Sequence, residues 1–142
     1  MKQTRKQISN KELIAIAKSV AGVRAPSKNV RIGSVGCALV TDKGNVYLGV
    51  NIHATCDIGF CSEHSAIASM VLNKEYVIKK IVAVHGNTIF PPCGRCRELM
   101  YQLHAKNQNT EVILSEKRTM KIRELLPDPW ENKISKYRNG KK

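Results

Sequence analysis

The sequence has few aromatic residues, few acidic residues and no long apolar run. Phenylalanine, tryptophan and tyrosine make up 5% of the 142 residues, which leaves little for stacking on successive nucleic-acid bases. No apolar run approaches the roughly 20 residues of a membrane span, and the first residues lack the apolar stretch of a signal peptide. We therefore expect a cytoplasmic protein.

The rest of the composition is that of a globular protein. Apolar residues make up 42% of the chain and charged residues 25%, which argues against both disorder and a fibrous protein. A chain of 142 residues can build a core without disulfides. We predict a single domain over residues 1–142.

The shortage of acidic residues leaves a formal net charge of +13, from 24 basic and 11 acidic residues. Eight basic residues and one acidic residue fall within 1–31, and five basic residues with no acidic residue fall within 133–142. Because chain ends are usually solvated, we interpret residues 1–8 and 131–142 as basic tails. We do not expect nucleic acid or a membrane as a partner.

Elements of two types alternate along the chain. Ser9-Asn10-Lys11-Glu12 is a capping box, with Ile8 and Leu13 as its hydrophobic staple, and it predicts a helix that ends at Gly22. The patterns that follow predict a hairpin (32–41 and 45–51), a helix (61–73), a strand (80–85), a helix (94–105), a strand (111–115) and a helical turn (122–126). Right-handed crossovers then predict an α/β fold whose later strands are parallel and covered by helices.

Five cysteines are an odd number, which argues against a disulfide framework and toward free thiols or metal ligands. Cys93 and Cys96 form a Cys-x-x-Cys pair at the start of one predicted helix, and Cys61 starts the helix before it. The pair alone fits a redox dithiol or half of a structural zinc site equally well. With Cys61 beside it, three ligands would leave a fourth tetrahedral position open, as in catalytic zinc sites.

Glu63 lies two residues after Cys61, where a carboxylate can move protons for water activated by zinc. A metal ligand, any residue and Glu, followed later by Pro-Cys-x-x-Cys, is the pattern of zinc deaminases. The spacing therefore predicts a catalytic zinc centre.

At these motifs the sequence resembles the cytidine deaminase family, over roughly residues 10–130. The matching segments, in the order of the family, are Val35–Leu39, Gly49–Ile52, Cys61–Glu63 and Pro92–Glu98. Pro92–Arg97, Ile122–Pro127 and Trp130 are more similar to blasticidin S deaminase than to ordinary cytidine deaminases. The resemblance implies a three-layer α/β/α fold with a mixed five-stranded sheet, one zinc per chain, and a homotetramer or dimer.

The resemblance also implies roles for single residues. Cys61, Cys93 and Cys96 match the zinc ligands, and Glu63 matches the proton shuttle. The substrate-binding candidates are the backbone carbonyl of Ser62 for the leaving amino group, Asn51 for a sugar hydroxyl, and Trp130 as an aromatic cap over the pocket or a subunit contact.

Three positions depart from the family pattern. His53 stands where the family has a glutamate for the ribose, and is either a substrate contact or a loop-packing residue. Gly33 stands where the family has an aromatic residue that packs on the pyrimidine. His64 replaces an arginine of several relatives. It either tunes the site, with a pKa raised by the thiolates, or is a surface histidine of the helix.

The sequence thus predicts a zinc-dependent hydrolase that deaminates the cytosine ring of cytidine, deoxycytidine or blasticidin S. Two alternatives stay open: a polynucleotide deaminase and a non-catalytic zinc-binding nucleic-acid module. Of the remaining cysteines, Cys37 is predicted to lie in the core and Cys56 on the surface or in the pocket wall. Of the remaining histidines, His85 is predicted to be structural and His104 to be a surface or capping residue.

Overall fold

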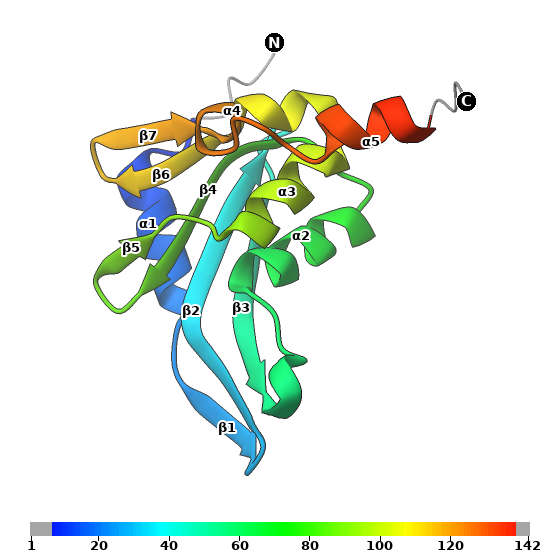
Figure 1. Cartoon of the computed structure of the whole chain (residues 1–142). Coiled ribbons are helices and arrows are strands. Elements are labelled where there is room, and N and C mark those ends of the chain that lie inside the picture. Colours follow the sequence, from blue (N-terminus) through cyan, green and yellow to red (C-terminus); the bar gives the residue numbers. More distant parts are fainter. Residues whose placement is uncertain (1–6, 139–142) are drawn as a thin grey trace.

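The computed structural model describes residues 7–138 and has three layers (Figure 1). Helix α1 (Asn10–Val20) covers one face of a central sheet, and helices α2 (Ser62–Leu72) and α3 (Gly94–Leu103) cover the other. This arrangement confirms the predicted α/β/α fold.

Within residues 7–138 the sheet has seven strands where five were expected. They are β1 (Arg24–Ser27), β2 (Val30–Thr41), β3 (Val46–Ala54), β4 (Ile78–His85), β5 (Thr88–Phe90), β6 (Glu111–Ser115) and β7 (Arg118–Lys121). The order in space is β3-β2-β4-β6-β7, with β1 paired to β2 and the short β5 paired to β4. Strand β2 is antiparallel to β3 and to β4, whereas β4 and β6 are parallel. Strands β3, β4 and β6 therefore run in one direction, as predicted.

Alternation along β2 divides the core between the two faces of the sheet. Cys37 and Leu39 pack in the cluster that contains the buried residues of α2 and α3. Ala38 and Val40 pack in the cluster that contains α1. Because successive strand residues point to opposite faces, one strand supports both helical layers.

Helix α1 begins at the predicted capping box. The Ser9 hydroxyl accepts a hydrogen bond from the Glu12 backbone N–H at 3.2 Å, and the Glu12 carboxylate accepts one from the Ser9 N–H at 2.8 Å. Ile8 and Leu13 pack in the same cluster, as the staple requires.

The C-terminal segment differs from the expected tail. After the short helix α4 (Ile122–Leu125), residues 131–138 form helix α5 (Glu131–Arg138). The segment is tied to α3, because the Glu98 carboxylate accepts a hydrogen bond from the Trp130 backbone N–H at 2.7 Å. Arg97 donates to the carbonyls of Pro92 and Leu125, at 2.7 and 2.8 Å. The other predicted tail residues, 1–6 and 139–142, lie outside the described residues.

Among residues 7–138 no helix has both the length and the apolar content that crossing a bilayer requires.

Candidate active site

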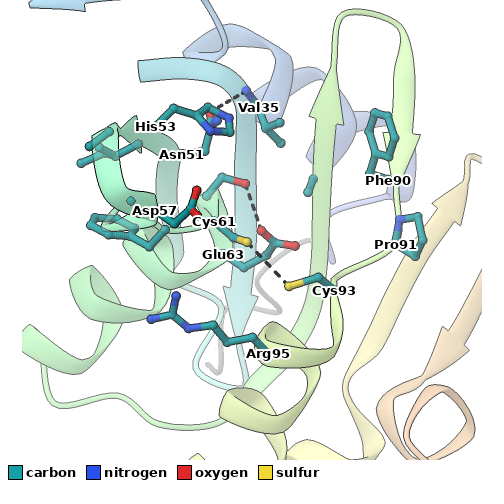
Figure 2. Close-up of a pocket in the computed structure, with 16 residues that line it drawn as sticks. Val35, Asn51, His53, Asp57, Cys61, Glu63, Phe90, Pro91, Cys93 and Arg95 are labelled. Atoms are coloured by element: carbon teal, nitrogen blue, oxygen red, sulfur yellow. Dashed lines mark hydrogen bonds between the residues drawn. The ribbon is translucent and has the colours of Figure 1, made fainter. Parts of the chain in front are cut away.

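Two helix N-termini meet on one side of the sheet (Figure 2). Strand β3 leads through the 3-10 turn η1 (Thr55–Asp57) to Cys61, the N-cap of α2. Strands β4 and β5 lead to Cys93, the N-cap of α3, and Cys96 lies in the first turn of that helix. The topology thus brings three cysteines to the two helix N-termini.

The three thiols form a compact cluster. The Cys93 sulfur lies 3.6 Å from the Cys61 sulfur and 3.6 Å from the Cys96 sulfur. The Cys61 and Cys96 sulfurs lie within 4.8 Å of each other. In a tetrahedral zinc site with Zn–S bonds of about 2.3 Å, sulfurs are separated by roughly 3.8 Å. The cluster therefore has the dimensions that zinc requires.

His64 also contacts the cluster, since its Nδ1 lies 3.4 Å from the Cys96 sulfur. Cys61, His64 and Cys96 form a second group, with ligand atoms within 4.8 Å, that can hold a metal. Cys61 and Cys93 line the adjoining cavity, whereas His64 does not. His64 therefore contacts the cluster without lining the cavity.

The thiols differ in their readiness to ionise. Burial, followed by the charges of Glu63 and Cys61, raises the pKa of Cys96 far above its ordinary value. Burial likewise raises the pKa of Cys61. Burial acts in the same direction on Cys93, but its hydrogen bonds with the backbone and thiol of Cys96 outweigh burial, so the pKa of Cys93 is lowered. A metal cation is the partner that lets all three ionise together.

Two features of the surroundings of His64 act against the expected rise of its pKa. Burial of the imidazole, and then the positive charge of Arg95, lower the pKa of His64 below its ordinary value. Arg95 comes from the first turn of α3, a contact that the local sequence around His64 does not reveal.

A cavity of about 360 Å³ adjoins the thiols. Glu63 lines it although its side chain is only 5% exposed. The carboxylate accepts a hydrogen bond of 3.1 Å from the hydroxyl of Ser62, which is also buried and also lines the cavity. A buried carboxylate thus lies in the same cavity wall as Cys61 and Cys93.

Asn51 and His53 belong to the part of the wall that comes from β3. They are two residues apart, so both side chains leave the same face of the strand. The Asn51 amide is fixed: its oxygen accepts from the Val35 N–H at 2.8 Å, and its nitrogen donates to the Ser34 hydroxyl at 2.8 Å. One amide hydrogen and one oxygen lone pair remain for a ligand. His53 is exposed at the cavity wall.

Gly33 departs from the family pattern for a structural reason. Its φ is +81°, and a Cβ at this position would lie 2.3 Å from the Gly22 carbonyl oxygen. No side chain fits there without moving the backbone. The aromatic residues among the described cavity-lining residues are instead Phe60 and Phe90, which sequence reasoning missed. Their positions beside the two cysteine motifs, just before Cys61 and just before Pro91-Pro92, were the available signal.

Asp57, a charged residue of the cavity wall, was also not singled out from the sequence. Trp130 was singled out as an aromatic cap over the pocket or a subunit contact, but it is 65% exposed and does not line the cavity of its own chain.

The remaining cysteines and histidines have structural or surface positions. Cys37 is in the core as predicted, where burial, and then the charge of Glu63, raise the pKa of its thiol well above the ordinary value. Cys56 is exposed and does not line the cavity. His85 hydrogen-bonds the Ser34 carbonyl, and His104 caps the 3-10 helix η2 (Ala105–Asn109) by accepting from the Lys106 N–H.

Comparison with known proteins gives consistent results. Residues 8–111 match the family model described as the cytidine and deoxycytidylate deaminase zinc-binding region. The chain is 28% identical to cytidine deaminase 6 of Arabidopsis thaliana over 126 residues, which cover 80% of this chain and 40% of that protein. It therefore spans about two-fifths of the length of this curated relative.

Solved structures agree with the fold. The cytidine deaminase of Burkholderia pseudomallei has a TM-score of 0.70 and 29% identity, with 87% of this chain and 100% of that chain covered. The cytidine deaminase of Mycobacterium tuberculosis has a TM-score of 0.73 and 22% identity, with 87% and 98% covered. Because the matched region binds zinc and the donor atoms fit it, zinc is the metal of this site.

Proposed function

Because the chain belongs to the cytidine and deoxycytidylate deaminase family, whose zinc-binding region matches residues 8–111, we propose that it hydrolyses the amino group from the cytosine ring of a free nucleoside. The candidate substrates are cytidine, deoxycytidine and the nucleoside analogue blasticidin S. The observation that carries the proposal is the position of Glu63, a buried carboxylate in the wall of the cavity that the thiol cluster adjoins.

Cys61, Cys93 and Cys96 are the proposed zinc ligands. When bound, zinc supplies a Lewis acid that makes water a nucleophile near neutral pH. Cys93→Ala should therefore lose most of its zinc, whereas His64→Ala should retain it, in metal analysis of the purified variants. The opposite result would assign the metal to Cys61, His64 and Cys96 instead.

Glu63 is the proposed proton carrier. Its carboxylate accepts a proton from the attacking water and delivers it to ring N3 as the water oxygen bonds to C4. It then takes the remaining proton from the new C4 hydroxyl and delivers it to the departing nitrogen, so that the C4 oxygen becomes a carbonyl, the C4–N bond breaks and ammonia leaves. One water is consumed, and the cytosine ring becomes a uracil ring.

The other wall residues would hold the substrate. The Ser62 carbonyl is the proposed acceptor for the exocyclic amino group, and the free hydrogen-bonding positions of Asn51 are proposed for a sugar hydroxyl. His53 is proposed as a second sugar contact. A cavity of about 360 Å³ is at the small end of the usual range for small-molecule sites, which supports a free nucleoside over a polynucleotide.

The test is a panel of cytidine, deoxycytidine and blasticidin S, followed by the ultraviolet change of cytosine deamination. Wild type should turn over at least one member. Glu63→Gln should keep zinc and the fold but lose activity by about 10²-fold or more, because an amide cannot carry the proton. Salt-dependent RNA binding without nucleoside turnover would favour a nucleic-acid function instead.

We also propose a homo-oligomer, a tetramer or a dimer, in the cytoplasm. Exposed apolar side chains on α2, including Leu72 at 83% exposure and Val71 at 37%, support a subunit contact there. A reducing compartment would keep the thiol ligands free. A monomer in light scattering at micromolar concentration would contradict the oligomer.

A further inference from the structure

We infer that Phe90 packs against the base of the bound nucleoside and that His85 positions the Phe90 ring. This inference rests on the proposed function, because it names a contact to the cytosine ring. It begins with the place of Phe90 at the end of β5, three residues before Cys93.

The ladder between β4 and β5 places Phe90 on the face of the sheet that carries the cavity. Phe90 pairs with Ala83, and directly opposed residues of antiparallel strands share a face of the sheet. Both residues line the cavity. Ala83 is small, so it leaves space in front of the ring. Figure 2 shows Phe90 and Pro91 on one side of the cavity, His53 and Asp57 on the other, and Glu63 between them.

Phe90 is 47% exposed, a large fraction for an aromatic side chain in a cavity wall. A planar base with its C4 at the thiol cluster would cover part of this surface. Aromatic rings stack on bases irrespective of sequence, since every base has a π-face. The position of Phe90 therefore suits contact with the ring that reacts, not with the sugar.

His85 restrains the Phe90 ring from the side. The two rings meet edge to face, with centroids 6.3 Å apart and planes at 72°. The Nδ1 of His85 lies 2.6 Å from the Ser34 carbonyl oxygen, and because a carbonyl only accepts, the imidazole donates. This hydrogen bond anchors the imidazole that contacts Phe90.

The same backbone segment also holds Asn51. The Ser34 hydroxyl accepts a hydrogen bond from the Asn51 amide nitrogen, and the Val35 N–H donates one to the Asn51 amide oxygen. Ser34 thus joins the proposed sugar contact to the proposed base contact. Both walls are set before a ligand arrives, which lowers the entropic cost of binding.

The test is cytidine binding by calorimetry in the inactive Glu63→Gln background, together with kcat and KM in the active protein. Phe90→Leu keeps an apolar side chain but removes the π-face, and should weaken binding about tenfold and raise KM with little change in kcat. Phe90→Trp should stay within about threefold of the parent protein. Tyr76→Leu is the matched control, because Tyr76 is similarly exposed, at 45%, and does not line the cavity.

A double-mutant cycle tests the role of His85. His85→Asn can still donate to Ser34 but offers no ring edge, so binding should weaken about threefold when Phe90 is present. In the Phe90→Leu background the same change should have almost no effect. An undiminished effect there would show that His85 does not act through Phe90.

The outcomes separate this inference from the proposed function. If wild type deaminates a cytosine nucleoside but Phe90→Leu leaves Kd and KM within about twofold, the base contact is wrong and the function stands. If wild type deaminates no member of the panel and Glu63→Gln binds none, the proposed function fails, and the inference fails with it.

Discussion

Gly49→Ala should displace the active-site residues of α2, because β3 and α2 are in close contact at Gly49. A Cβ at Gly49 would lie 2.3 Å from the Ser62 carbonyl oxygen and 2.3 Å from the Ala66 backbone nitrogen, against the 3.4 Å at which ordinary contact begins. Both atoms belong to the backbone of α2, so no side chain can rotate away. The helix must move by about 1 Å, and Cys61 and Glu63 move with its first turn.

Two consequences should be measurable. Overpacking of this kind costs about 1–3 kcal/mol of unfolding free energy, which a urea titration followed by circular dichroism would detect. A displacement of about 1 Å in the first turn of α2 should lower kcat/KM for the nucleoside substrate by about 10²-fold. Gly22→Ala is the control, because a Cβ there meets nothing within 4 Å and should change neither quantity. Unaltered stability, zinc content and activity in Gly49→Ala would refute the packing argument.

Three further changes have defined outcomes. Ser9→Ala removes the hydroxyl that caps α1 and should lower the unfolding free energy by about 0.5–2 kcal/mol in urea titration, with no loss of zinc. Hydrogen bonds from Thr41, Asn45 and Tyr47 lower the pKa of Glu75 in the folded protein. The ionised carboxylate therefore stabilises the fold above the unfolded pKa of about 4.3. This stabilisation is lost as the pH falls through the lower, folded pKa. Glu75→Gln should therefore be less stable than wild type at neutral pH, and a difference that persisted unchanged below about pH 4 would contradict this account. Removal of zinc by a chelator should lower the melting temperature of wild type but not that of Cys93→Ala, and equal shifts in calorimetry would place the metal elsewhere.

Much of the fold could be predicted because it depends on local periodicity. The alternation of Cys37, Ala38, Leu39 and Val40 follows from the two-residue period of a strand with helices on both faces. Strands β1 and β5 lack such a pattern. All four residues of β1 are exposed and one is Pro26, so its pairing depends on the presence of β2. Helix α5 was missed for a related reason, because the segment is tied down by the contact of Trp130 with Glu98, 32 residues away.

The candidate site divides in the same way. The thiols and Glu63 could be predicted because metal chemistry needs particular residue types at fixed spacing. The aromatic wall could not, since Phe90 reaches the cavity through the reversal between β4 and β5, where Gly86 has a φ of +57°. The pKa of His64 depends on burial of the imidazole and then on Arg95 from another helix, and only the packed structure creates both conditions.

The tie between Trp130 and α3 offers a spectroscopic consequence. Trp130 is the single tryptophan in the sequence, and its backbone is bonded to Glu98, two residues after Cys96. Its intrinsic fluorescence therefore reports on the start of α3 without an added label. On titration with a chelator, a change in emission that precedes any loss of far-ultraviolet circular dichroism would mark loosening of this helix end while the sheet is still intact.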